Sequence, residues 1–197
     1  MGGADNDSIM IQTIIADVEN ASARYQLGTG ADTVTMSGTV TSGASLGTFV
    51  FSSLSESNLS ALDKYDLGDG NASGSGDAIF DFSNNASAAG AVGATSAAIL
   101  FGSDANKATI ASNKVVLSGT LNVSSVTAVA ATVDTLTVSA GAGTTVLFTD
   151  KGGTDYLFMQ GGTAGTADDA IVMFAGLSAA SIAASSAVTV TFSGTDS

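Results

Sequence analysis

Apolar and polar residues alternate with a period of two in several short runs of this chain, and this alternation most narrows the folds it can adopt. Successive side chains of a β-strand point to opposite faces, so such runs are typical of half-buried strands. Glycine or serine separates the runs, which are 32–36, 117–123, 135–138 and 188–192. The pattern predicts a mainly β protein, a β-solenoid or β-sandwich of short strands with Gly/Asp turns and one or two short helices.

Three segments depart from simple alternation. Segment 55–65 has leucines on roughly one side and no glycine, which predicts a short helix. Segment 83–98 is rich in alanine and favours a helix, although its two glycines weaken it. Segment 9–23 fits a helix or a buried strand, and we favour the strand because its neighbours are strand-like.

The chain contains a loose internal echo between residues 18–35 and 133–146. In each stretch a strand-like run leads through Gly-x-Gly to a second run, as in the rows of a β-solenoid. A change from alanine-rich to valine-rich sequence near 103–112 predicts a domain boundary. It separates an Asp/Gly-rich region with short helices, 1–105, from a β-rich region, 106–197. A single domain is the alternative.

The charge of the chain limits its partners. Five basic residues against 18 acidic ones give a net charge of −13, so nucleic acid and anionic membrane surfaces are poor partners. Only two of the acids are glutamates, and the other 16 are aspartates. This preference for the shorter carboxylate, beside many glycines, favours turns and ligands for hard cations. A halophilic or simply soluble acidic surface is the alternative interpretation.

Several residue types are missing from the chain. Without Cys it has no disulfides or thiolate chemistry, and without His it lacks the commonest general base. We find no Ser-x-x-Lys, phosphate-loop or dinucleotide pattern, so we do not expect an enzyme. No apolar run reaches the roughly 18 residues of a spanning helix, so we expect no membrane insertion. The N-terminus lacks the pattern of a signal peptide, which alone would favour the cytosol.

Two segments resemble the nonapeptide G-G-x-G-x-D-x-U-x of calcium-binding β-rolls, in which U is apolar. Segment 2–10 matches at both leading glycines, at Asp7 and at Ile9, whereas Asp5 replaces the third glycine. Segment 27–35 matches at two glycines, at Asp32 and at the apolar position.

A third candidate, 74–79, is one residue short of the nonapeptide. Ordinary hairpin turns are the alternative for all three segments. Because each ion in such rolls is shared by successive turns, an isolated copy needs a partner elsewhere in the fold or on a neighbouring chain.

A second acidic group surrounds the glycine-rich stretch 68–76. A flexible loop with carboxylates and an Asn carbonyl can supply the six to eight oxygens that calcium takes. A solvated acidic loop is the alternative. The group consists of Asp63, Asp66, Asp69, Asn71, Asp77 and Asp81. Over both motifs, the predicted calcium ligands are Asp5, Asp7, Asp32, Asp66, Asp69, Asn71 and Asp77.

The C-terminal part carries a distinctive string. Gly152-Gly153-Thr154-Asp155-Tyr156 opens a strand, 162–165 reads Gly-Thr-Ala-Gly, and 168–177 runs from Asp-Asp-Ala-Ile-Val to Gly-Leu. This string resembles the last segment of Gram-negative S-layer proteins and related RTX-type proteins exported by the type I pathway. The clear match covers about 152–192, a fifth of the chain.

The resemblance implies calcium-dependent folding outside the cell, an uncleaved C-terminal export signal, and self-assembly. We therefore expect a secreted, non-enzymatic structural protein that assembles with calcium into a cell-surface layer or an extracellular filament. Its expected partners are further copies of itself, with a cell-surface polysaccharide as another candidate. The alternative is a calcium-folding and secretion module of a larger enzyme or adhesin.

Overall fold

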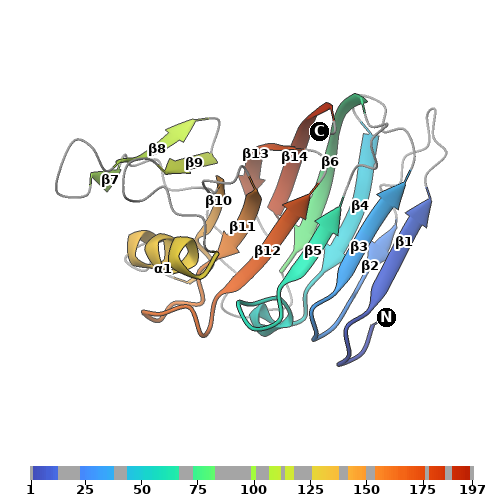
Figure 1. The fold of residues 1–197 in the computed structure, drawn as a ribbon, viewed down its shortest axis with the longest axis horizontal. Coiled ribbons are helices and arrows are strands. Elements are labelled where there is room, and N and C mark those ends of the chain that lie inside the picture. Colours follow the sequence, from blue (N-terminus) through green and yellow to red (C-terminus); the bar gives the residue numbers. More distant parts are fainter. Residues whose placement is uncertain are drawn as a thin grey trace.

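The described part of the protein is mainly β, as the alternation predicts. Its strands form two sheets that contain both parallel and antiparallel neighbours (Figure 1). The computed structural model describes residues 2–12, 23–37, 44–66, 73–82, 99–100, 107–111, 114–117, 126–137, 142–149, 154–175, 178–184 and 188–195.

The two sheets differ in size. In spatial order, the first sheet contains β1 (Ser8–Gln12), β3 (Thr33–Ser37), β5 (Asp63–Asp66), β12 (Ala170–Ala175), β11 (Asp155–Met159), β10 (Thr145–Thr149), β9 (Lys114–Leu117), β8 (Lys107–Ala111) and β7 (Ile99–Leu100). The second sheet contains β13 (Ser178–Ala184), β14 (Val188–Thr195), β6 (Ser73–Asp81), β4 (Ala44–Val50) and β2 (Arg24–Tyr25). The described helical segments are α1 (Val126–Thr137) and a 3-10 turn (Leu54–Glu56).

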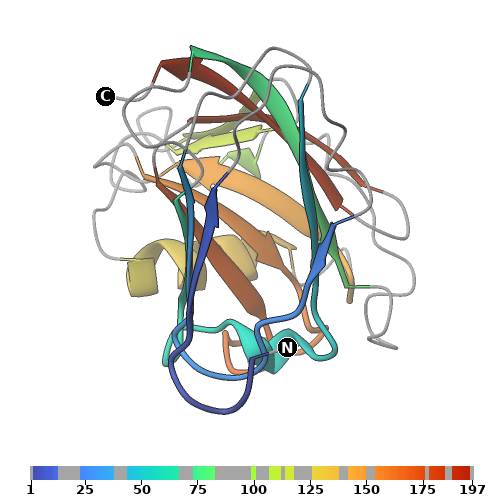
Figure 2. The same cartoon turned by 90° about the vertical axis from the view of Figure 1, so that its right-hand side faces the viewer.

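The N-terminal strands follow a regular path. The chain passes three times from the first sheet to the second, from β1 to β2, from β3 to β4 and from β5 to β6. Each pass lies parallel to the previous one in both sheets. Figure 2 shows that the segment before β1 and the two connections back to the first sheet lie at one end of the molecule.

The C-terminal strands continue both sheets. Strand β12 pairs in parallel with β5, and β14 pairs antiparallel with β6. Each sheet therefore contains strands from both sides of residue 105.

Aromatic rings fill the space between the facing sheets. Tyr25, Phe49 and Phe80 occupy equivalent positions of β2, β4 and β6, and each successive pair stacks with ring centroids 5.4 Å apart. From the first sheet, Tyr65 meets Phe49 edge-on at 4.7 Å, and Phe174 meets Phe80 at 5.3 Å. These contacts hold the sheets together, because each large ring removes much apolar surface from water.

Helix α1 covers another part of the core. Ala130 and Val133 are buried against a cluster that includes Phe148 and Phe158. The prediction of a strand at 135–138 is therefore wrong, since 135–137 form the last turn of α1. Apolar residues that recur at helical spacing over the whole of α1 outweigh the short alternation at its end.

Other element predictions had mixed outcomes. Strands at 32–36 and 188–192 are confirmed, in β3 and β14. The helix expected at 55–65 is wrong, because only a 3-10 turn forms at Leu54–Glu56 and β5 begins at Asp63. Pairing of β5 with β3 and β12 on its two sides overrides the weak helical pattern.

The remaining predictions extend beyond the described residues. The strand predicted at 9–23 is present as β1 up to Gln12, and 13–22 lie outside the described residues. The run 117–123 begins at the last residue of β9, and its remainder lies outside them, as does 83–98.

We predict that Phe49→Ala destabilises the protein by about 4 kcal/mol, because it leaves a cavity among three aromatic rings. Urea unfolding followed by circular dichroism measures the change. The matched control is Met10→Ala, at a side chain that is 68% exposed, and it should change stability by less than about 0.5 kcal/mol. Equal effects of the two substitutions would contradict the assigned core.

Candidate functional site

The two nonapeptide-like segments lie directly against each other. The parallel register of β1 and β3 pairs Ser8 with Thr33, so the turn before β1 stacks on the turn before β3. Backbone hydrogen bonds join them: the Thr29 N–H donates to the Gly3 carbonyl at 3.0 Å, and the Thr33 N–H donates to the Asp7 carbonyl at 2.9 Å. The fold thus supplies the neighbour that each isolated copy lacked.

Glycine is required in the second turn for a steric reason. Gly28 has a φ of +99°, and a Cβ there would collide with the carbonyl oxygen of Gly3. Gly30 has a φ of +140°, and a Cβ there would lie 2.5 Å from the carbonyl oxygen of Asp5. L side chains rarely adopt this backbone conformation. The Gly-x-Gly of the second segment therefore allows the first turn to pack closely on it.

Three aspartates occupy equivalent positions at the starts of β1, β3 and β5, and we call Asp7, Asp32 and Asp63 the acidic ladder. Each carboxylate accepts a backbone N–H, which comes from its own turn for Asp7 and from the preceding ladder aspartate for Asp32 and Asp63. Gly3 N–H donates to Asp7 Oδ2 at 2.9 Å, Asp7 N–H donates to Asp32 Oδ1 at 2.8 Å, and Asp32 N–H donates to Asp63 Oδ1 at 3.0 Å. Such bonds orient the carboxylates and stabilise their charge.

Two members of the acidic ladder are buried with incomplete hydrogen bonding. Asp32 is 1% exposed and Asp63 is 0% exposed, and the Oδ2 atom of each is buried without a hydrogen-bond partner in the part of the chain that the structure describes. Burying a charged oxygen without a partner costs free energy of desolvation. A proton or a cation at these two atoms would remove that cost.

Burial also changes the protonation of this region. Desolvation raises the pKa of Asp63 to about 8, and repulsion from Asp32 and Glu56 adds to it, while the hydrogen bond from Asp32 N–H acts in the opposite direction. Burial likewise raises the pKa of Glu56. The negative charges of Asp32 and Glu56 therefore disfavour ionisation of Asp63 in this desolvated region.

The acidic ladder ends at β12. The position next to Asp63 in that strand is occupied by Val172, an apolar residue. The N–H of Asp63 donates to Ser57 Oγ at 3.0 Å, and the Ser57 hydroxyl donates to the carbonyl of Ile171. Ser57 therefore closes the backbone hydrogen bonding where a fourth acidic step would stand.

The other predicted ligands do not join the acidic ladder. The side chain of Asp5 is exposed in the first turn. Asp66 ends β5 and forms an ion pair with Lys64 at 3.7 Å, and Asp77 is exposed on β6 in the second sheet. Asp69 and Asn71 lie outside the described residues.

The turn predicted at 74–79 is wrong, because these residues lie inside β6. Pairing with β14 on one side and β4 on the other uses the backbone groups that a turn would have left free.

Asp63 is the ladder residue that matches no nonapeptide, and the sequence placed it in the acidic group around 68–76 and not with Asp7 and Asp32. Its sequence context, Asp-Lys-Tyr, has the same acid, polar and apolar order as Asp-Ser-Ile at Asp7 and Asp-Thr-Val at Asp32. This order was the available signal. The match of 63–65 to the other two segments is easily overlooked, because no Gly-x-Gly precedes Asp63 and because the nearby acids suggest a loop.

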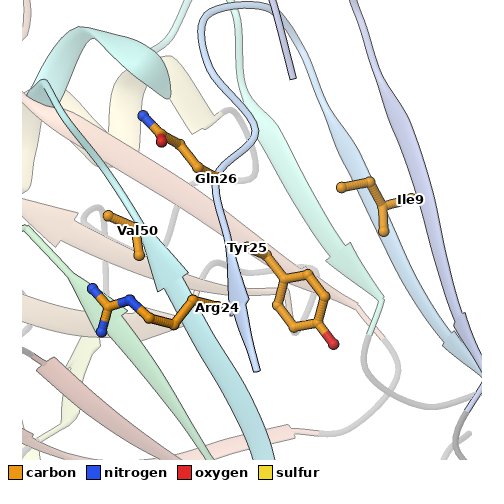
Figure 3. Close-up of a pocket in the computed structure, with 5 residues that line it drawn as sticks. All are labelled: Ile9, Arg24, Tyr25, Gln26 and Val50. Carbon is orange, nitrogen blue, oxygen red and sulfur yellow. The ribbon is translucent and has the colours of Figure 1, made fainter. Parts of the chain in front are cut away.

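The N-terminal edges of the two sheets line a partly open pocket of about 280 Å³. Figure 3 shows Ile9 of β1 and Tyr25 of β2 pointing toward the space between the sheets. Arg24, Gln26 and Val50 complete the lining. Arg24 also forms an ion pair with Asp81 of β6 at 2.7 Å. The interior is thus partly open at the edge formed by β1 and β2.

Within the described ranges, three or more acidic side chains nowhere converge in a way that could hold a metal ion by themselves. No helix in these ranges is long and apolar enough to cross a membrane. Comparison with models of protein families, with curated proteins and with solved structures gave no significant match.

The raised pKa of Asp63 gives a prediction with a definite sign. The folded protein holds this proton up to about pH 8, whereas an unfolded Asp loses it near 3.8. The stability that Asp63 contributes is therefore complete below about pH 4 and is lost as the pH rises toward 8. In a chelator-containing buffer, Asp63→Asn should match the wild type near pH 4 and exceed its unfolding free energy by several kcal/mol, on the order of 5, at pH 8.

Urea unfolding across this pH range measures the difference between wild type and variant. Asp77→Asn is the matched control, because its side chain is exposed on β6, and its difference from wild type should stay constant with pH. An Asp63→Asn difference that also stays constant would contradict the assigned burial.

Proposed function

We propose that this protein is a non-enzymatic structural protein, secreted to the cell surface, in which calcium holds stacked turns together and promotes assembly into a layer or filament. The observation that carries the proposal is the acidic ladder. Two segments with the nonapeptide pattern stack in register, and a third aspartate extends their carboxylates by one step.

The N-terminal passes are, in this proposal, coils of a short β-solenoid. The parallel pairs β1-β3-β5 and β2-β4-β6, with their connections at one end, fit this interpretation. In a solenoid each coil repeats the position of the turn below it. Calcium-binding rolls share ions between successive turns in this way, so stacked turns are what shared ions require.

Calcium fits the acidic ladder better than other common cations. The unpartnered atoms are carboxylate oxygens, and the chain contains neither Cys nor His for softer metals. Calcium takes six to eight oxygens in flexible geometry, and backbone carbonyls and water can complete a set that starts with Asp32 and Asp63. Magnesium keeps more of its water and suits a buried pair less well.

The edges formed by β1 and β2 support assembly between copies. Both are the last described strands of their sheets, and the exposed edge of a sheet can add a strand from another chain. Ile9 and Tyr25 there are only partly buried, and Met10 is 68% exposed. We propose that a second copy covers this edge and completes its core. A cell-surface polysaccharide is a further candidate partner.

The C-terminal segment also bears on export. By its resemblance to type I substrates, the apolar stretch from about 170 to 193 acts as an export signal that remains on the mature chain. Strands β12 and β13 and most of β14 lie within this stretch, and they pair within the two sheets. We propose that export precedes folding, and that calcium outside the cell then favours the folded state.

The test compares size and stability with and without calcium. At calcium 100-fold above its dissociation constant, the unfolding free energy should rise by about 2.7 kcal/mol per site at pH 8. Light scattering and electron microscopy should show regular assemblies that chelator dissolves. Asp32→Asn and Asp63→Asn should lose most of the gain from the acidic ladder, whereas Asp77→Asn should retain it.

The outcomes separate the two candidate functions. Regular calcium-dependent assemblies support the structural protein. A monomer that folds only with calcium favours the alternative, a folding and secretion module of a larger enzyme or adhesin. A folded monomer that responds neither to calcium nor to chelator would contradict both.

A further inference from the structure

A second acidic group lies far along the chain from the acidic ladder, in the loop between β11 and β12. This loop, residues 160–169, contains Asp168 and Asp169, and helix α1 contributes Asp134. Figure 1 shows α1 beside this part of the first sheet. We call Asp134, Asp168 and Asp169 the loop acids.

Asp134 ties the helix to the loop. Its Oδ1 accepts a hydrogen bond from Gln160 Nε2 at 3.1 Å, and its Oδ2 accepts one from the Gly165 N–H at 2.8 Å. The same Gln160 nitrogen donates to the Thr163 carbonyl at 3.0 Å. Asp134 is 5% exposed and Gln160 is 0% exposed, so these bonds form in a desolvated place where they are strong.

Asp168 and Asp169 each have one satisfied oxygen and one orphaned oxygen. Asp168 Oδ2 accepts from the Thr163 N–H at 3.2 Å, and Asp169 Oδ1 accepts from the Gly161 N–H at 2.8 Å. Asp168 Oδ1 and Asp169 Oδ2 are buried and have no hydrogen-bond partner among the described residues. Asp169 is 1% exposed, and neither residue forms an ion pair within the described part of the chain.

The backbone holds these two carboxylates in place. A Cβ on Gly161 would collide with the carbonyl oxygen of Asp168, so the two ends of the loop are in close contact. Gly162 has a φ of +108° and Gly165 a φ of +98°, conformations that favour glycine. The loop thus holds two adjacent carboxylates, each with one buried oxygen, in a fixed arrangement, and like charges so placed repel unless a proton or a cation neutralises them.

We propose that this loop binds a calcium ion through Asp168 Oδ1 and Asp169 Oδ2, and that Asp134 makes the docking of α1 depend on that ion. Backbone carbonyls and water supply the remaining ligands, as calcium allows. The ion neutralises the carboxylates and fixes the loop, and the fixed Gly165 N–H then holds Asp134 of the helix. This site shares no residue with the acidic ladder, so it goes beyond the proposed function and can fail independently of it.

Calcium titration calorimetry at pH 8 tests the second site. The variants are Asp168→Asn and Asp169→Asn, which keep an oxygen for the Thr163 or Gly161 N–H and should fold. We expect each to weaken one class of calcium site at least tenfold. Asp63→Asn should weaken the other class and leave this one intact, and Asp66→Asn, next to Lys64 on β5, should change neither.

Amide hydrogen exchange distinguishes calcium binding by the loop from a purely structural role of its carboxylates, because only calcium binding makes the exchange rate depend on calcium. In the wild type, calcium should slow exchange at least tenfold in peptides that contain 161–169 and 126–137. In Asp168→Asn that slowing should disappear, while calcium still slows exchange around the acidic ladder.

Each outcome decides one proposal. If both loop variants keep wild-type calcium affinity and exchange, the loop site is wrong and the acidic ladder is unaffected. If the loop variants lose binding but Asp63→Asn does not, the ladder site is wrong and the loop site stands. If Asp169→Asn does not fold, the result from Asp168→Asn, whose side chain is less buried, decides the loop site alone.

Discussion

The parallel register of β1 on β3 on β5 is the constraint on which the described N-terminal structure depends. It stacks the turns before these strands, and it places Asp7, Asp32 and Asp63 in one row. The same register brings Ile9, Val34 and Tyr65 into one apolar row beside the acids, facing the rings of the second sheet. A shift of the strand register by one residue would exchange inward and outward side chains. The same shift would therefore disrupt both the aromatic core and the acidic ladder.

Burial distinguishes the carboxylates that can bind a cation from those that are simply solvated. An exposed aspartate such as Asp77 is solvated and carries little structural information. Within the described ranges, Asp32 and Asp63 have a backbone partner for one oxygen and none for the other, and the same holds for Asp168 and Asp169. The two acidic groups lie at different places in the first sheet, yet both bury carboxylate oxygens, and we propose that a hard cation neutralises each group.

The sequence predicted the mainly β fold and several strands, because alternation reports directly on strands with one buried face. It failed where long-range pairing decides the outcome. The alternation at 63–65 is too short to predict a strand. Residues 63–66 form one because β3 and β12 pair with them on both sides. The two nonapeptide-like segments pointed to Asp7 and Asp32, which the structure places in stacked turns. Asp63 and the loop acids could not be grouped, because their contacts join residues far apart in the chain.

The most direct test of the central claim is a crystal structure determined with calcium at pH 8, with anomalous diffraction used to identify the ion. Our account predicts an anomalous peak within calcium–oxygen bonding distance, about 2.4 Å, of Asp32 Oδ2 or Asp63 Oδ2. Well-ordered density for both carboxylates at millimolar calcium, with only water or a shared proton between them, would contradict it.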